Sequence, residues 1–169
     1  MNKINILLLA FLLLLISLLS CFNNSIDRFR DISWGTNINT FKKNEFIFEN
    51  TSSYVQGLKS YTRENERLNY YNIKVSKIKY LFLNDKFVAV SIVVQGKQNC
   101  SNIKNTLEDK FGKPEQKLVF KDSVNMTEWN VKQISIQLHE RDDEAELMFF
   151  YNKLLKNIVS GTDANVKNL

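Results

Sequence analysis

The chain has few of the residues on which metal centres and phosphate-binding loops depend. Its 169 residues include one histidine, two cysteines, five glycines and one proline. A single histidine excludes the His-Glu-x-x-His zinc motif and multi-histidine centres, and two cysteines are too few for a thiolate zinc site. The dinucleotide-binding glycine pattern, the P-loop and the Gly-x-Ser-x-Gly motif do not occur. We therefore expect no metal, no other cofactor and no enzymatic activity.

The first 21 residues are much more apolar than the rest. Sixteen of them are hydrophobic, whereas the whole chain is 44% hydrophobic. Lys3 is their only charged residue, and an unbroken apolar run follows from Ile6 to Ile16. This pattern is typical of a signal peptide. No second run long enough to span a bilayer follows, so cytosolic and polytopic membrane proteins are both excluded.

The end of this segment, Leu18-Leu19-Ser20-Cys21, resembles the lipobox of bacterial lipoproteins. The resemblance implies that residues 1–20 are removed as a lipoprotein signal peptide and that the Cys21 thiol receives diacylglycerol. The new amino group is often acylated in that family, and palmitate is the expected fatty acid. Two or more acyl chains make a stable anchor, whereas one is marginal. The alternative is an ordinary secretory signal or an uncleaved anchor in which the cysteine is incidental.

Cleavage before Cys21 changes the charge and the thiol count. Removing Lys3 takes the formal net charge from +5 to 22 − 18 = +4, and the lysines are interleaved with acids. A solvated surface explains that distribution better than a nucleic-acid patch does. Cys100 becomes the only free thiol, so no intramolecular disulfide is expected. Its position near a predicted helix start favours either a reactive thiol or, more simply, a partly buried inert one.

After the cleavage site, the sequence predicts one folded domain. Residues 21–30 form the lipidated cysteine and a short tether, residues 31–159 a single α+β domain, and residues 160–169 a flexible tail. Helices are expected at 36–43 and 101–111, the second ended by Gly112 and Pro114. Strands are expected at 45–49, 54–61, 73–83, 87–94, 117–121, 126–131, 133–139 and 145–151, and a last helical turn at 153–159. The predicted fold is an antiparallel sheet with helices on one face, in the order helix, strands, helix, strands.

Three short segments look like a pattern found in small uncharacterised bacterial exported proteins. They are the run from Phe29 to Thr36, the run from Leu83 to Val90, and the end of the second predicted helix with Gly112 and Pro114. The predicted architecture is also similar to the BamE and β-lactamase-inhibitor-protein type of domain. Those domains act by binding other proteins, so the resemblance implies a binding function without assigning any contact residue.

The remaining candidate site residues are polar groups near one turn. His139 could act as a general base beside Asp142 or Asp143, but an exposed histidine next to an acidic turn is the simpler interpretation. The acidic cluster of Asp142, Asp143, Glu144 and Glu146 lacks the spacing of a calcium loop, which favours a solvated hairpin turn.

Aromatic side chains give the sharpest hypothesis for a binding surface. Trp34 and Trp129 are expected to pack in the core. The consecutive pairs Tyr70-Tyr71 and Phe149-Phe150 would, in strands, point to opposite faces of a sheet. One member of each pair is therefore a candidate for an exposed recognition surface.

The sequence thus predicts a lipid-anchored protein of a bacterial cell envelope, in the outer membrane by expectation, that binds another envelope protein. The alternative is a lipoprotein displayed on the cell surface that binds a host or environmental ligand. No nucleic-acid partner is expected. The prediction rests on the lipobox and on the missing catalytic motifs.

Overall fold

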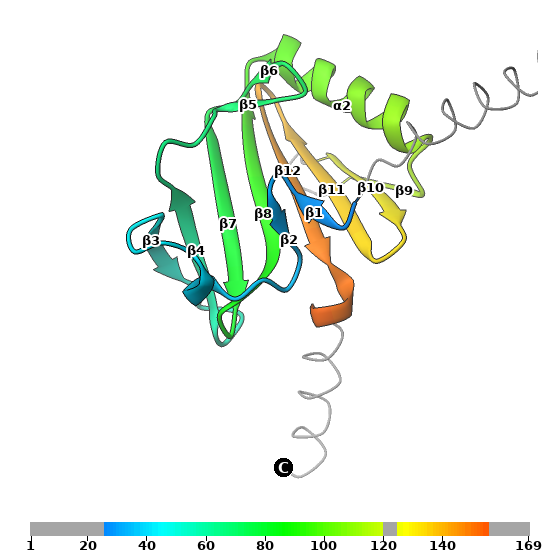
Figure 1. The fold of residues 1–169 in the computed structure, drawn as a ribbon. Helices are drawn as coiled ribbons and strands as arrows, with labels where there is room; N and C mark the ends of the chain where they lie inside the picture. The colour runs from blue at the N-terminus through cyan, green and yellow to red at the C-terminus, as the bar shows by residue number, and fades with distance from the viewer. Residues whose placement is uncertain (1–25, 120–124, 156–169) are drawn as a thin grey trace, which may run out of the picture.

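The computed structural model describes residues 26–119 and 125–155 (Figure 1). The predicted signal peptide, the lipidation site Cys21 and the predicted tail at 160–169 lie outside these residues. The described elements are β1 (Arg28–Phe29), β2 (Ile32–Ser33), the 3-10 turn η1 (Ile38–Thr40), β3 (Phe46–Thr51), β4 (Leu58–Arg63), β5 (Asn69–Tyr70), β6 (Ile73–Lys74), β7 (Lys77–Leu83), β8 (Lys86–Gln95), α2 (Lys97–Phe111), β9 (Gln116–Val119), β10 (Asn125–Val131), β11 (Ile134–Arg141) and β12 (Glu144–Tyr151). Residues 152–155 are also helical.

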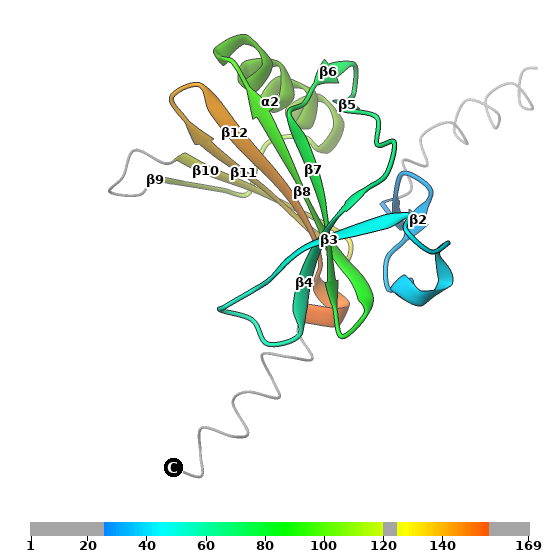
Figure 2. The same cartoon turned by 90° about the vertical axis from the view of Figure 1, so that its left-hand side faces the viewer.

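Eight strands form one antiparallel sheet in the order β3-β4-β7-β8-β12-β11-β10-β9. Figure 2, in which the β3 side faces the viewer, shows how strongly the sheet twists between its two edges. Tight turns join β7 to β8, β10 to β11 and β11 to β12. In the first of these, Asn84 and Asp85 both have positive φ, 47° and 64°, as a two-residue hairpin turn of the primed type requires. These turns set the register, because each leaves no spare residues between the paired strands.

The helix α2, the hairpin β1–β2 and the hairpin β5–β6 cover one face of the sheet and enclose the main core. Ile103 and Leu107 lie four residues apart on α2 and are both fully buried. They pack in one cluster with side chains from alternate positions of the central strands, including Tyr80, Val90, Ile136 and Leu147. The helix ends at Gly112 with φ of 81°, as predicted. Within the described ranges, no helix is long and apolar enough to cross a membrane.

The opposite side of the sheet, here called the open face, is more polar. Ser91 on β8 donates a hydrogen bond of 2.5 Å to Glu146 on β12, and Ser135 on β11 donates one of 2.6 Å to Glu128 on β10. A small second cluster around Val88 and Ala89 is partly covered by the 51–57 loop and by residues 152–155. β11 therefore has one apolar and one largely polar face, whereas Val88 and Ala89 on β8 and Phe150 on β12 make part of the open face apolar.

The predicted α+β class is wrong. Of the described residues, 52% are in strands and 18% are helical, and the long antiparallel sheet dominates. The predicted order of helix, strands, helix, strands fails at its first element, because the helix expected at 36–43 is only the three-residue turn η1.

Backbone pairing with the β7–β8 hairpin explains the loss of the first helix. The Phe87 N–H donates to the Thr36 carbonyl at 2.9 Å, and the Ile38 N–H donates to the Asp85 carbonyl at 2.8 Å. The Asn37 side chain accepts from Asn39 N at 2.8 Å and caps a single turn. A helix this short is marginal by itself, so long-range backbone bonds decide the conformation.

The folded domain starts earlier than residue 31. Phe29, placed in the tether by the sequence prediction, is 5% exposed and belongs to the core. Its ring lies 5.8 Å from that of Tyr80 and 6.2 Å from that of Phe149. The core therefore includes a residue that the sequence prediction assigned to the tether.

Candidate functional site

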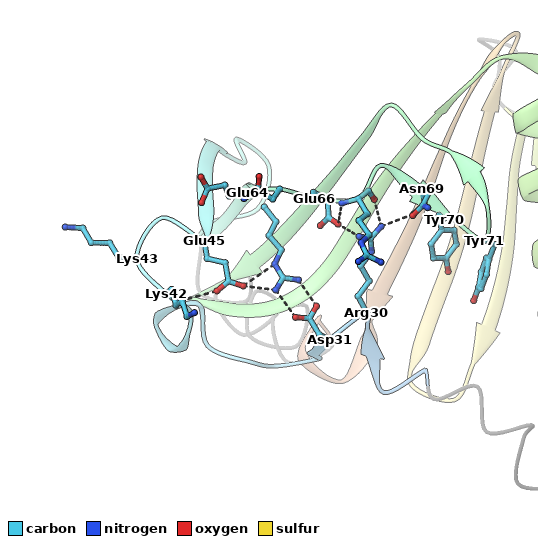
Figure 3. Close-up of a pocket in the computed structure, with 13 residues that line it drawn as sticks. Arg30, Asp31, Lys42, Lys43, Glu45, Glu64, Glu66, Asn69, Tyr70 and Tyr71 are labelled. Carbon is cyan, nitrogen blue, oxygen red and sulfur yellow. Dashed lines mark hydrogen bonds and ion pairs between the residues drawn. The ribbon is translucent and has the colours of Figure 1, made fainter.

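A cleft of about 850 Å³ opens where the end of β1, the turn before β3 and the segment after β4 meet (Figure 3). We call it the charged cleft, because most of its lining side chains are ionisable. The lining residues are Arg30, Asp31, Lys42, Lys43, Glu45, Arg63, Glu64, Asn65, Glu66, Arg67, Asn69, Tyr70 and Tyr71. Three separate segments of the chain thus contribute charged groups to one hollow.

Glu66 is the most deeply buried of the ion-paired side chains in the charged cleft, with 8% of its side chain exposed. It pairs with the guanidinium of Arg30, accepts a hydrogen bond from the Tyr80 hydroxyl, and accepts the Arg67 N–H at 2.9 Å. Burial and the hydrogen bond to Glu66 raise the pKa of Tyr80. Tyr80 therefore stays protonated and acts as a fixed donor to the carboxylate.

Arg63 holds the other side of the charged cleft through two carboxylates. It makes a two-pronged contact with Asp31 at 2.6 and 2.7 Å and reaches Glu45 at 2.7 Å. The hydrogen bond from Arg63 lowers the pKa of Asp31. Two acids compensating one base leave this group with an excess of negative charge, and the planar guanidinium fixes its geometry.

Arg30 ties the segment after β4 to the β1–β2 hairpin. Besides pairing with Glu66, its guanidinium donates to the carbonyl oxygens of Arg67 at 2.6 Å and Asn69 at 2.8 Å. Figure 3 shows these bonds converging on one side chain. A single arginine therefore orders a loop that has little regular structure of its own.

Left-handed backbone is concentrated around the charged cleft. Five of the eight non-glycine residues with positive φ in the described part of the chain line it or adjoin it: Arg30, Asn44, Asn65, Tyr71 and Asn72. Asparagine tolerates this conformation, but Arg30 at 54° and Tyr71 at 47° are unfavourable. Such strain persists only where surrounding contacts impose it, and it is common at binding and active sites.

Two tyrosines close one end of the charged cleft. The rings of Tyr70 and Tyr71 lie 4.3 Å apart, and Lys110 Nζ of α2 lies 4.1 Å from the Tyr71 ring. Burial raises the pKa of Tyr70. The alternation expected for two strand residues does not apply to this pair, because β5 ends at Tyr70 and Tyr71 lies in the turn after it. Tyr71 is 40% exposed and is the aromatic group that the charged cleft presents to solvent.

Some cations at the mouth of the charged cleft have no acidic partner. Lys42, Lys43 and Arg67 are exposed, and among the described residues no carboxylate lies within ion-pair distance of their side-chain nitrogens. Of the acids that line the cleft, Glu64 and Asp31 are exposed, and Asp31 is paired with Arg63. The rim, formed by these exposed cations, therefore has positive charge outside any ion pair, while Arg30 and Glu66 on the floor compensate each other.

Two ionisable groups at the charged cleft are each held in one protonation state. Asp31 is held ionised by Arg63, and Tyr80 is held protonated by burial and Glu66. General acid–base catalysis needs a group whose pKa lies near the working pH, and the shifts at these two residues run the other way.

Only one of the two cysteines lies in the part of the chain that the structure describes. Cys21, the predicted lipidation site, lies outside the described residues. Cys100 is 7% exposed, and its Sγ lies 3.8 Å from the Val94 carbonyl oxygen. Burial raises the pKa of the Cys100 thiol, which disfavours the reactive thiolate. Of the two alternatives left open by the sequence, the structure favours the inert thiol.

The other predicted candidates do not converge on the charged cleft. His139 lies on the open face with Nε2 3.4 Å from the Gln137 amide oxygen, and it pairs across strands with Glu146. Asp142 and Asp143 form the exposed β11–β12 turn. In residues 26–119 and 125–155, no group of three histidine, cysteine or acidic residues is placed to hold a metal ion.

Both tryptophans have packing roles. Trp34 stacks on Phe87 with ring centroids 4.7 Å apart and donates to the Ile26 carbonyl at 2.6 Å. Trp129 is 1% exposed and donates to the Gly112 carbonyl at 2.9 Å. Phe149 is buried in the main core and Phe150 packs against the cluster on the open face, so this pair does alternate as predicted.

Sequence reasoning missed Arg30, Arg63 and Glu66, which organise the charged cleft. Arg30 and Glu66 are 36 residues apart, and Arg63 and Asp31 are 32 apart. No local spacing rule connects such residues. The only available signal was the dense charged run from Arg63 to Arg67.

Comparison with protein-family models, curated proteins and solved structures finds no match to this chain.

Proposed function

We propose that this protein is a lipid-anchored component of a bacterial cell envelope that binds another envelope protein through the charged cleft. The observation that carries the binding role is the cleft itself. It has strained left-handed backbone at Arg30 and Tyr71, an ion-paired floor, and unpaired cations at its rim. Strained, preorganised polar surfaces are characteristic of recognition sites.

The anchoring role rests on the lipobox at Cys21. Ile26, where the described domain begins, is five positions after Cys21. A fully extended chain of that length spans at most about 18 Å. The domain would then be held close to the lipid headgroups, and a partner would be found within the same membrane or near its surface.

Site-specific photo-cross-linking in the native bacterium tests the binding role. A photoreactive amino acid replaces Lys43 or Tyr71 in the charged cleft, and Lys97 at the start of α2 serves as the matched exposed control. We expect a discrete protein adduct from the first two positions and none from the third. Adducts that are absent, or equally strong at Lys97, would overturn the cleft as the binding site.

The anchor has an independent test. Cys21→Ala should prevent acylation and move the protein from the membrane fraction to the soluble fraction, and metabolic labelling with a palmitate analogue should be lost with it. Continued membrane association of this variant would contradict lipid anchoring while leaving the cleft hypothesis standing.

A further inference from the structure

The edge strand β3 has the features of a site for strand addition. In the described part of the chain, its only strand partner is β4. The Glu64 N–H donates to the Glu45 carbonyl at 2.9 Å. Because backbone groups alternate in direction along an antiparallel strand, those of Phe46 and Phe48 point away from β4. Each outward residue offers one N–H and one C=O to an incoming chain.

β3 also exposes large apolar side chains. Ile47 is 53% and Phe48 is 54% exposed, and as neighbours in a strand they lie on opposite faces of the sheet. Natural edge strands are commonly protected by lysine or proline. β3 contains neither residue, and its only irregularity is a shift in register between Phe48 and Asn50.

The start of β3 adjoins the free positive charge of the charged cleft. Lys42 and Lys43 precede the strand and are both exposed, whereas the following acid, Glu45, is occupied by Arg63. At the other end, the strand leads into the uncharged stretch from Asn50 to Tyr54. The edge is therefore electrically asymmetric, positive at one end and neutral at the other.

We propose that β3 accepts an extended segment of a partner protein as a ninth strand, with acidic residues of that segment meeting Lys42 and Lys43. This inference rests on the proposed function, in that the partner is a protein, and it specifies what part of the partner is recognised. Backbone hydrogen bonds hold the segment, Ile47 and Phe48 contact its apolar residues, and the two lysines fix its direction.

Labelled synthetic peptides and full-length protein in detergent test the proposal by fluorescence anisotropy. The probes are eight-residue peptides of alternating valine and threonine with two aspartates at one end or at the other, and matched peptides with two lysines instead. We expect an aspartate peptide to bind about tenfold more tightly than its lysine counterpart. Equal binding of both charge types would overturn the acidic specificity.

Charge reversal on the protein identifies the lysines responsible. Lys42→Glu combined with Lys43→Glu should invert the preference between the two kinds of peptide. The matched control combines Lys97→Glu with Lys132→Glu, two exposed lysines away from β3, and should leave the preference unchanged. Inversion by the control pair as well would assign the effect to net charge and overturn the site.

Two variants of Phe48 distinguish hydrogen bonding by its backbone from apolar contact by its ring. Phe48→Ala removes the ring, and Phe48→Pro removes both the ring and the outward N–H, which an edge position tolerates. Strand addition predicts at least about tenfold weaker binding for the proline variant than for the alanine variant. Equal losses, with both variants folded by circular dichroism, would contradict strand addition.

A second copy of this chain is the competing occupant. Analytical ultracentrifugation of the full-length protein in detergent measures whether two copies associate. A concentration-dependent dimer that Phe48→Pro abolishes would overturn the proposal in favour of β3 pairing with itself. If cross-linking at Lys43 identifies a partner but no peptide binds, strand addition fails while the proposed function stands.

Discussion

The centre of the sheet and the part around its β3 edge differ in how they are held together. The central strands β7, β8, β12 and β11 each pair with a strand on both sides, and their side chains facing α2 are almost completely buried, as in Tyr80, Val90 and Leu147. The β3–β4 side ends in an edge strand and has half-exposed aromatic rings and ion pairs. Burial of apolar area stabilises the first region, whereas charge pairing orders the second.

This difference in packing predicts which substitutions affect stability and which affect binding. A tightly packed core tolerates little change in side-chain volume. The β3 side has outward-pointing backbone groups, exposed side chains and unpaired charge, and each of these can contact a binding partner. We therefore expect substitutions in the centre to affect folding most and substitutions on the β3 side to affect binding most.

The largest expected effect is the difference in stability between two phenylalanine-to-alanine variants, one in the centre of the sheet and one on the β3 side. Phe87 is fully buried and stacks on Trp34, so Phe87→Ala should lower the free energy of unfolding by about 4 kcal/mol through lost contacts and a cavity. Phe48→Ala should cost less than about 1 kcal/mol, since Phe48 is 54% exposed. Urea denaturation of both variants measures the difference, and equal losses would remove the distinction between the regions.

An intermediate effect is expected at the floor of the charged cleft. Glu66→Ala leaves the Arg30 guanidinium and the Tyr80 hydroxyl without their shared acceptor, and we expect a loss of about 3 kcal/mol. The neighbouring exposed acid provides the control, because Glu64→Ala should change stability by less than about 0.5 kcal/mol. Thermal unfolding compares the two variants. A Glu66 variant as stable as the Glu64 variant would show that the buried pair does not hold the cleft.

The smallest effect is a dependence on pH at the ion pair of Asp31 and Arg63. The pKa of Asp31 is lowered from 3.8 in the folded protein, so its ion pair with Arg63 contributes stability above about pH 4. That contribution is lost as the pH falls through the lower, folded-state pKa. Asp31→Asn should therefore be less stable than the wild type at pH 6, and the difference should shrink as the pH is lowered below about 4. A stability difference independent of pH would assign the effect to something other than this carboxylate.

Much of the regular structure was predictable. The hairpin around Asn84-Asp85, the strands from β7 to β12 within a few residues, and the end of α2 at Gly112 follow from turn chemistry and from the alternation of apolar side chains. The first helix was not predictable, because its residues bond to the backbone of Phe87 and Asp85, far along the chain. Local propensity is weak beside such contacts.

The candidate site was hardly predictable. Tyr71 was recognised as a possible exposed aromatic, but the reason given for it was wrong, since it lies in a turn and contacts Tyr70 directly. The sequence prediction placed Arg30 in the tether and did not include Glu66 among the candidate site residues. Whether an arginine is a solvated surface group or orders a loop depends on how far it is buried and on the neighbours that it finds there.

The sequence by itself determined the strands, the tight turns and the apolar face of α2, because alternation, helical spacing and turn chemistry operate between residues close together in the chain. Only the tertiary structure decided that Arg30, Arg63 and Glu66 form one site and that β3 is an open edge. Those outcomes depend on contacts across more than 30 residues and on which strand is left without a neighbour, and both are set by the packing of the whole sheet.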